Sequence, residues 1–264
     1  MEMNIAWLYP DILNLHGDRG NMMAFSKIAE SMGIELNIIK VHSHEDISDL
    51  NNIDLIYMGA GQLRDMKHVI DDMVQYKDAL TEYVNSNGYI LVTGSTGCVL
   101  SKGFVMADKT KVKGLGILDM TAKELNRTKT PFVTREVYGD DIFWKTSDGM
   151  EIVGCQIQRL DFTLKNGVEP LGELIYGYGN NCTDGKEGAR YKNVFFTNTV
   201  GPLLSCNPWL GIKLLKDIAE AKGEELDNNQ KEPDYMQYAK KSMELKKKFI
   251  RDKSKQRGIT YTGC

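Results

Sequence analysis

Short apolar runs alternate with helix-length amphipathic stretches along the first part of the chain. The runs are NIAWL at residues 4–8, ELNIIKVH from Glu35, DLIYMG from Asp54 and YILVTG from Tyr89 to Gly94. Their length and β-branched content are typical of buried strands. Apolar residues at helical spacing lead up to Gly33, and the segment from Met66 to Val84 predicts one long amphipathic helix. Strands and helices alternating in this way predict a doubly wound α/β fold with a mostly parallel sheet.

The pattern changes after about residue 112, where shorter strand-like runs are separated by glycine and asparagine turn signals. These runs predict an antiparallel or mixed extension of the sheet. Asn207-Pro208 supplies an N-cap and an N1 proline for a helix that packs back onto the sheet. A polar, lysine-rich helical pattern follows from Tyr235 to Arg257. We therefore expect one domain over residues 1–227 and a helical tail over residues 228–264.

Composition excludes several classes of function. The net charge of -3 provides no global field that would hold a nucleic acid or an anionic membrane surface. The chain shows neither a signal peptide nor an apolar run of membrane-spanning length, so we expect a cytoplasmic protein. Its five cysteines are scattered and form no C-x-x-C pair, which argues against a disulfide framework or a cysteine-built zinc site. We expect neither a metal nor a cofactor.

Three loops that follow predicted strands are candidates for a ligand site, because ligands of doubly wound sheets bind beyond the carboxyl ends of the strands. They cover residues 15–21, 59–64 and 93–98. In the second loop, the small residues Gly59, Ala60 and Gly61 allow backbone amides to approach a ligand, as an oxyanion hole requires. An ordinary tight strand-to-helix turn is the alternative interpretation.

The third loop has the pattern of a nucleophile elbow, in which a strained residue between a strand and a helix presents a nucleophilic side chain. Gly94 stands at the apex of this elbow and has no side chain that could attack a substrate. Ser95 and Cys98 remain as off-register candidates. Cys98 lies in the first helical turn, where the helix dipole would lower the pKa of the thiol. The alternative is that both are small residues that simply pack.

The distribution of histidines limits the available bases. All four lie within the first 68 residues of the chain, and none follows His68. A thiol nucleophile normally needs a nearby base, most often histidine, so a pairing with a histidine in a late loop is excluded. His16 lies in a candidate ligand loop and could reach the crevice, or it could be a solvated loop residue.

Several segments together resemble one family. They are YPDILNL at residues 9–15, GDRGN at 17–21, GLGILD at 114–119, YGYGNN at 176–181, and GPLL at 201–204 ahead of Asn207-Pro208. In this order they resemble the glutaminase subunits of lipid II isoglutaminyl synthases, within the cobyric-acid-synthase-type class I glutamine amidotransferases. The lysine-rich tail is also similar to that of the family. The resemblance implies a flavodoxin-like amidotransferase fold that covers most of the chain.

The chain departs from the family at both catalytic positions. The family's Cys-Gly-Gly-Tyr-Gln elbow falls on residues 94–98, which places Gly94 at the nucleophile position, and its His-Gly-Pro falls on residues 200–202, which places Val200 at the base position. Its Gly-Phe-Glu-Asn-His loop falls on residues 154–158 and its Gly-Gly-Gly-x-Asp loop on residues 59–63. Asn126-Arg127 matches the family arginine implied to bind the carboxylate of glutamine, although a solvated arginine is an equal alternative. The expected ligand-binding residues are therefore Arg127, Gly59, Ala60, Gly61, Gln62, Ser95 and Gln156.

These departures support a pseudo-amidotransferase. The leading hypothesis is a non-catalytic partner or activator of a Mur-ligase-like ATP-dependent subunit in cell-wall precursor metabolism, with L-glutamine or a related amino acid as its candidate ligand. The alternative is an active amidotransferase that uses Cys98 or Ser95 as an off-register nucleophile. A third hypothesis is that free ammonia enters the ligase directly. The lysine-rich tail either contributes to the partner interface or is a solvated helix.

Overall fold

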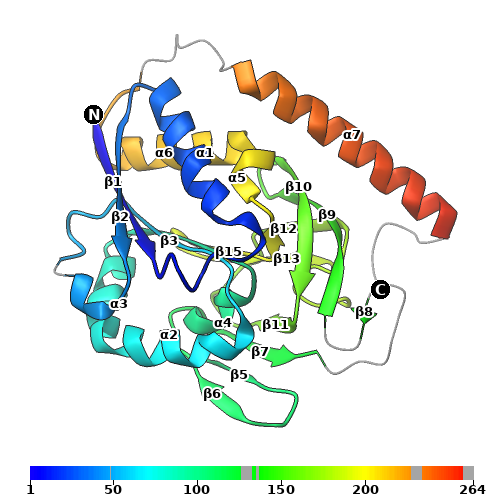
Figure 1. Ribbon diagram of the computed structural model, residues 1–264, viewed down its shortest axis with the longest axis horizontal. Helices are drawn as coiled ribbons and strands as arrows, with labels where there is room; N and C mark the ends of the chain where they lie inside the picture. The colour runs from blue at the N-terminus through cyan, green and yellow to red at the C-terminus, as the bar shows by residue number, and fades with distance from the viewer. Residues whose placement is uncertain (48, 126–132, 135–136, 227–233, 258–264) are drawn as a thin grey trace.

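A six-stranded sheet forms the centre of the protein. The computed structural model describes residues 1–47, 49–125, 133–134, 137–226 and 234–257 (Figure 1). The central strands, in spatial order, are β14 (Ala189–Tyr191), β15 (Val194–Thr197), β4 (Tyr89–Thr93), β3 (Leu55–Met58), β1 (Glu2–Leu8) and β2 (Glu35–Val41). All neighbours pair in parallel except β14, which adds an antiparallel edge to β15.

Helices cover both faces of this sheet, which confirms the doubly wound prediction. One face carries α1 (Arg19–Ser31), α5 (Leu203–Cys206) and α6 (Pro208–Ala221), and the other carries α2 (Met66–Met73), α3 (Lys77–Asn85) and α4 (Gly97–Leu100) (Figure 1). Alternate residues of β1 supply both cores, because successive side chains of a strand point to opposite faces. Ile5 and Trp7 join the first core, whereas Ala6 and Leu8 join the second.

The helix predicted from Met66 to Val84 is divided. A short 3-10 turn at Val74–Tyr76 separates α2 from α3. Buried side chains continue across the break, from Met73 through Tyr76 to Leu80. The apolar periodicity correctly predicts which side chains are buried, but it does not show where the helix is interrupted.

The remaining strands form two further sheets, the first antiparallel and the second mixed. The first contains β8 (Val133–Thr134), β9 (Val137–Thr146), β10 (Glu151–Gln158), β12 (Gly172–Tyr176), β13 (Lys186–Glu187) and β16 (Thr199–Val200). The second contains β5 (Gly103–Val105), β6 (Lys111–Lys113), β7 (Met120–Glu124) and β11 (Leu160–Leu164). The predicted antiparallel extension is thus present mainly as separate sheets that pack against the central one.

Asn207 occupies the N-cap position of α6 and Pro208 its first turn, as predicted. The side chain of Asn207 does not cap that helix, however. Its Oδ1 accepts from the backbone N–H of Val153 at 3.0 Å, and its Nδ2 donates to the carbonyl of Val153 at 2.8 Å. The amide therefore ties the start of α6 to β10, a long-range role that the local sequence pattern does not reveal.

The lysine-rich tail forms α7 (Asp234–Arg257), which confirms the predicted helix; the expected domain boundary at residue 227 lies outside the described residues. Met243 and Ile250 of α7 pack against Phe143 and Val153 of the β9–β10 pair. Lysines on the same side of α7 form ion pairs with β9 and β10, which include Lys246 with Asp141 at 3.1 Å and Lys247 with Glu151 at 2.7 Å. The small apolar contact is thus reinforced by charge.

Truncation of Ile250 tests how α7 is held. Ile250 is fully buried, so we expect Ile250→Ala to lower the free energy of opening of α7 by about 2–4 kcal/mol. The matched control is Leu245→Ala on the exposed side of the same helix, for which the expected change is within about 0.5 kcal/mol. Hydrogen exchange of the α7 amides measures both. Equal effects of the two substitutions would contradict this packing.

Candidate functional site

The three candidate loops meet at the carboxyl ends of β1, β3 and β4, and Asp18 holds them together. The buried carboxylate of Asp18, from the first loop, accepts from the backbone N–H of Ala60 and from the hydroxyl of Thr93, the latter at 2.8 Å. It also accepts from the side-chain amide of Asn21 at 3.1 Å. Burial raises the pKa of Asp18 from 3.8 to about 6, despite these hydrogen bonds, which favour the ionised form.

The third loop has the strand–turn–helix geometry of a nucleophile elbow. Gly94 follows β4 directly and has a φ of +61°, a conformation that is strained for any residue with a side chain. The elbow is fastened to the second loop by Thr96, whose hydroxyl donates to the carbonyl of Gly59 at 2.7 Å, and by Ser95, whose hydroxyl donates to that of Gly61 at 2.5 Å. The backbone geometry of an elbow is thus present without a side chain at its apex.

Gly94, Ala60 and Val200 lie together, although they come from three distant parts of the sequence. A Cβ atom at Gly94 would lie 2.9 Å from the Cβ of Ala60 and 3.2 Å from Cγ1 of Val200. Val200 belongs to β16 and is fully buried. The space in which a side chain at the apex would begin is therefore occupied by two apolar groups.

The second loop does not form the expected oxyanion hole at Ala60. The backbone N–H of Ala60 points inward and donates to Asp18, so it is not directed at a bound ligand. Gly59 is needed for packing, because a Cβ atom there would meet the carbonyl oxygen of Leu13 at 2.3 Å. Small residues in this loop thus permit close packing of the backbone against the first loop, which is the tight-turn alternative.

A cavity of about 400 Å³ opens beside the elbow. It is lined by Leu15, His16, Gly61, Gln62, Leu63, Arg64, Ser95, Met106, Glu124, Ile157 and Arg159. Three residues predicted to bind ligand, Gly61, Gln62 and Ser95, therefore share one wall. His16 also lines the cavity, and partial burial lowers its pKa from the ordinary value, which favours the neutral imidazole.

Two charged residues of this cavity were missed in the sequence analysis. Nη2 of Arg159 donates to Oε1 of Glu124 at 2.6 Å, and the other oxygen of Glu124 accepts from the backbone N–H of Ala107 at 2.8 Å. Arg159 follows β10 and Glu124 ends β7. A charged residue at a strand end is a weak sequence signal, and only the packing of separate sheets brings this pair to the elbow.

Cys98 does not have the properties expected of an off-register nucleophile. Its side chain is fully buried in the apolar core beneath the sheet. Burial raises the pKa of this thiol well above its usual range, whereas the helix dipole had been expected to lower it. Desolvation exceeds the dipole effect because the thiol is fully buried and α4 is a single turn, whose dipole is small. Cys98 therefore packs as a small apolar residue.

Gln156, another residue predicted to bind ligand, is not among the residues that line the cavity beside the elbow. Gln156 is fully buried, and its Oε1 accepts from the backbone N–H groups of Tyr178 and Gly179 at 3.1 and 3.2 Å. Its Nε2 donates to the carbonyl of Gly179 at 2.8 Å. The side chain thus joins β10 to the turn after β12 in the interior. Arg127 lies outside the described residues.

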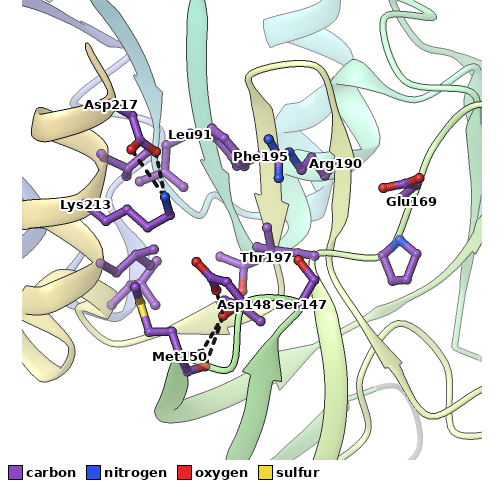
Figure 2. Close-up of a pocket in the computed structure, with 16 residues that line it drawn as sticks. Leu91, Ser147, Asp148, Met150, Glu169, Arg190, Phe195, Thr197, Lys213 and Asp217 are labelled. Carbon is purple, nitrogen blue, oxygen red and sulfur yellow. Dashed lines mark hydrogen bonds and ion pairs between the residues drawn. The ribbon is translucent and has the colours of Figure 1, made fainter. Parts of the chain in front are cut away.

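A second cavity, of about 190 Å³, lies on the α6 face of the central sheet (Figure 2). Figure 2 shows Lys213 and Asp217 of α6 on one side of it, with Arg190 of the edge strand β14, Phe195 of the adjacent strand β15, and Asp148 below. Lys213 and Asp217 already form an ion pair at 3.1 Å. None of the residues that the sequence predicts to be catalytic or ligand-binding lines this cavity. Within the described part of the chain, no group of three His, Cys, Asp or Glu side chains could hold a metal ion.

Comparison with known proteins agrees with this geometry. Residues 4–208 match the family model of the CobB/CobQ-like glutamine amidotransferase domain. The chain is 31% identical over 221 residues to the lipid II isoglutaminyl synthase (glutamine-hydrolyzing) subunit GatD of Streptococcus pneumoniae, covering 84% of this chain and 82% of that protein. It is 30% identical to the corresponding GatD subunit of Staphylococcus aureus, covering 86% of this chain and 90% of that protein.

Solved structures show the same fold at lower identity. A glutamine amidotransferase crystal structure matches with a TM-score of 0.55 and 18% identity, covering 81% of this chain and 98% of that one. The PurLQS structure from Thermotoga maritima matches with a TM-score of 0.55 and 14% identity, covering 84% of this chain and all of the matched chain. From the family match and the two relatives, together with the doubly wound sheet and its elbow, it follows that this chain belongs to the CobB/CobQ-like glutamine amidotransferase family.

Proposed function

We propose that this chain is a glutamine amidotransferase-like subunit that has lost glutaminase chemistry and acts as a non-catalytic partner or activator of a Mur-ligase-like amidating enzyme. The two GatD relatives are named as subunits of lipid II isoglutaminyl synthase, which supports a role in cell-wall precursor metabolism. The similarity to these subunits extends over most of this chain, which supports assembly of this chain with a partner subunit.

The observation that carries the loss of chemistry is the contact among Gly94, Ala60 and Val200. A class I amidotransferase needs a nucleophile at the elbow and a base that takes its proton. Here the apex of the elbow, Gly94, has no side chain, and the neighbouring space holds a methyl group of Ala60 and the isopropyl group of Val200. Neither group can transfer a proton, and both obstruct a side chain at position 94.

Binding of an amino acid remains compatible with this loss. The cavity beside the elbow keeps polar groups on Gln62 and Ser95 and the charged pair Glu124–Arg159. We propose L-glutamine or a related amino acid as its ligand, with Arg127 as the further candidate for the carboxylate. A carboxylate pairs well with the planar donor set of an arginine side chain.

The competing function is an active amidotransferase with an off-register nucleophile. Ser95 is its better candidate, since the hydroxyl lines the cavity, whereas Cys98 is buried. The hydroxyl of Ser95 donates to the carbonyl of Gly61, and that carbonyl cannot accept a proton as a general base does. The geometry therefore favours the non-catalytic proposal.

Ammonia release from glutamine by the purified chain separates the two functions. We expect release at the background rate for the native chain, Ser95→Ala and Cys98→Ala alike, with calorimetry reporting whether glutamine binds. Turnover above background that disappears in either variant would establish the active enzyme and overturn our proposal.

The partner role needs a separate measurement. Gentle copurification from the native host is expected to recover a ligase-like ATP-dependent subunit, and the pair is expected to amidate its acceptor with ammonium salts but not with glutamine. Recovery of no such subunit, or amidation driven by glutamine, would contradict the corresponding part of the proposal.

A further inference from the structure

The charge of this protein is unevenly distributed. Helix α7 contains nine basic and three acidic residues, a net charge of +6, whereas the whole chain carries -3, so the other residues carry -9. The net charge had argued against a field that could hold an anionic surface. Helix α7 can still attract an anionic surface locally, because surface charges act mainly within about 8–10 Å at physiological salt.

Six of the seven lysines of α7 fall into two groups. Lys246, Lys247 and Lys253 point inward and form ion pairs with acidic residues of β9 and β10. Lys241, Lys248 and Lys255 recur every seventh residue, and all three are exposed. Seven residues complete nearly two helical turns, so these three side chains form one row along the outer side of the helix.

A row of apolar side chains runs beside these lysines. Tyr238, Leu245 and Phe249 are 68%, 61% and 58% exposed, and they are three of the seven large exposed hydrophobic residues among those that the structure describes. Their spacing of seven and four residues places them on one side of the helix. Figure 1 shows α7 at the periphery of the protein, with one long side turned away from the other helices and the sheets.

We propose that this outer face of α7, formed by Tyr238, Lys241, Leu245, Lys248, Phe249 and Lys255, binds the surface of an anionic lipid bilayer. Lysines beside aromatic and aliphatic side chains match an interface in which phosphate head groups lie next to the acyl chains. A second copy of the chain fits poorly, because pairing two such faces would bring the lysine rows together. The contact is peripheral, since no described helix is long and apolar enough to cross a membrane.

The inference is independent of the proposed function, because it concerns a face built by α7 alone. Cosedimentation of the full chain with vesicles tests it. One set of vesicles contains equal parts phosphatidylglycerol and phosphatidylcholine, and the other contains phosphatidylcholine only. We expect binding to the anionic vesicles only, and we expect that binding to weaken as salt is added.

Variants locate the binding face. The triple substitution Lys241→Glu, Lys248→Glu and Lys255→Glu is expected to weaken vesicle binding by at least roughly a hundredfold. The matched control, Lys40→Glu with Lys111→Glu and Lys216→Glu, makes the same change in net charge at exposed positions on other elements and is expected to bind nearly as the native chain does. Leu245→Ser with Phe249→Ser is expected to weaken binding while retaining its salt dependence.

Circular dichroism and the melting temperature verify that each variant is folded. Absence of binding by the native chain would overturn the proposal, as would unchanged binding by the α7 lysine variant. Equal losses in the α7 variant and its matched control would also overturn it, because the binding would then reflect net charge rather than this face.

Discussion

Gly94→Cys alone is expected to destabilise the protein by about 3 kcal/mol, and adding Ala60→Gly is expected to recover a large part of that loss. Two costs combine in the single substitution. A side chain at a φ of +61° is strained, and its Cβ atom would lie 2.9 Å from the Cβ of Ala60. Removing the methyl group of Ala60 relieves the second cost and leaves the first, together with the close approach of that Cβ atom to Cγ1 of Val200 at 3.2 Å.

Urea unfolding of Gly94→Cys, Ala60→Gly and the double variant measures this coupling directly. Gly116 provides the control, since its φ is +75° and a Cβ atom there would meet nothing within 4 Å. Gly116→Cys is therefore expected to show the backbone strain alone, with no coupling to Ala60→Gly. A double variant as unstable as Gly94→Cys would show that the methyl group of Ala60 is not the obstacle.

A further substitution in this series tests the reactivity of a thiol at position 94. Adding Val200→His to the double variant places an imidazole at the proposed base position, close to the introduced thiol. We expect that thiol to react faster with iodoacetamide at neutral pH than the thiol of the double variant, because an adjacent base increases the thiolate fraction. Equal reaction rates would indicate that position 200 does not face the elbow closely enough to serve as a base.

Asp18 is expected to make the stability of the protein depend on pH in the opposite direction to an ordinary paired carboxylate. Burial raises its pKa from 3.8 to about 6, so the folded protein holds the proton more tightly than the unfolded chain does. The stability that Asp18 contributes is complete below about pH 4 and is lost as the pH rises through about 6. A shift of about two units corresponds to about 3 kcal/mol.

Asp18→Asn isolates this contribution because asparagine does not titrate. We expect the stability of the native protein, relative to that of Asp18→Asn, to fall by about 3 kcal/mol between about pH 4 and pH 8. The substitution itself has a cost that is independent of pH, since the side-chain amide of Asn21 now donates to Asp18 and would face a second N–H donor. A stability difference that stays constant over this range would show that Asp18 keeps an ordinary pKa.

Asp18→Ala separates titration from the role of Asp18 in joining the loops. Without the carboxylate, the backbone N–H of Ala60 and the hydroxyl of Thr93 both lose their acceptor in a buried site. We expect this variant to be less stable than Asp18→Asn at every pH, because each unsatisfied buried donor costs about 1–3 kcal/mol. Chemical denaturation of both variants across the pH range makes the comparison.

The central sheet was predictable because its signals are local. A buried parallel strand needs apolar residues on both faces, and the runs that form β3 and β4 have them. The elbow was also predictable, since a strand that ends in Thr93-Gly94 must turn at once into the next helix. The helices that cover the central sheet were predictable from the spacing of apolar residues, apart from the break at Val74–Tyr76 within the segment predicted as one helix.

The candidate site was predictable only in part. The positions of Gly94 and Val200 were identified from the family resemblance. Their contact with Ala60, however, forms only when three loops and a strand that are far apart in the sequence come together in space. The cavity pair Glu124–Arg159 joins residues from separate sheets, so no local pattern indicated it. The burial of Cys98 was missed because its position in a first helical turn does not show how much protein covers that turn.

By itself, the sequence determined that the chain is a doubly wound α/β protein whose elbow has no side chain at its apex, since residue types and local periodicity do not depend on packing. Only the tertiary structure decided that Ala60 and Val200 fill the space beside Gly94, that Asp18 rather than a ligand takes the N–H of Ala60, and that Gln156 lies in the interior. These outcomes depend on burial and on contacts between segments distant in sequence. Such contacts arise when the loops and sheets pack together, and so they set the volume and polarity of the crevice.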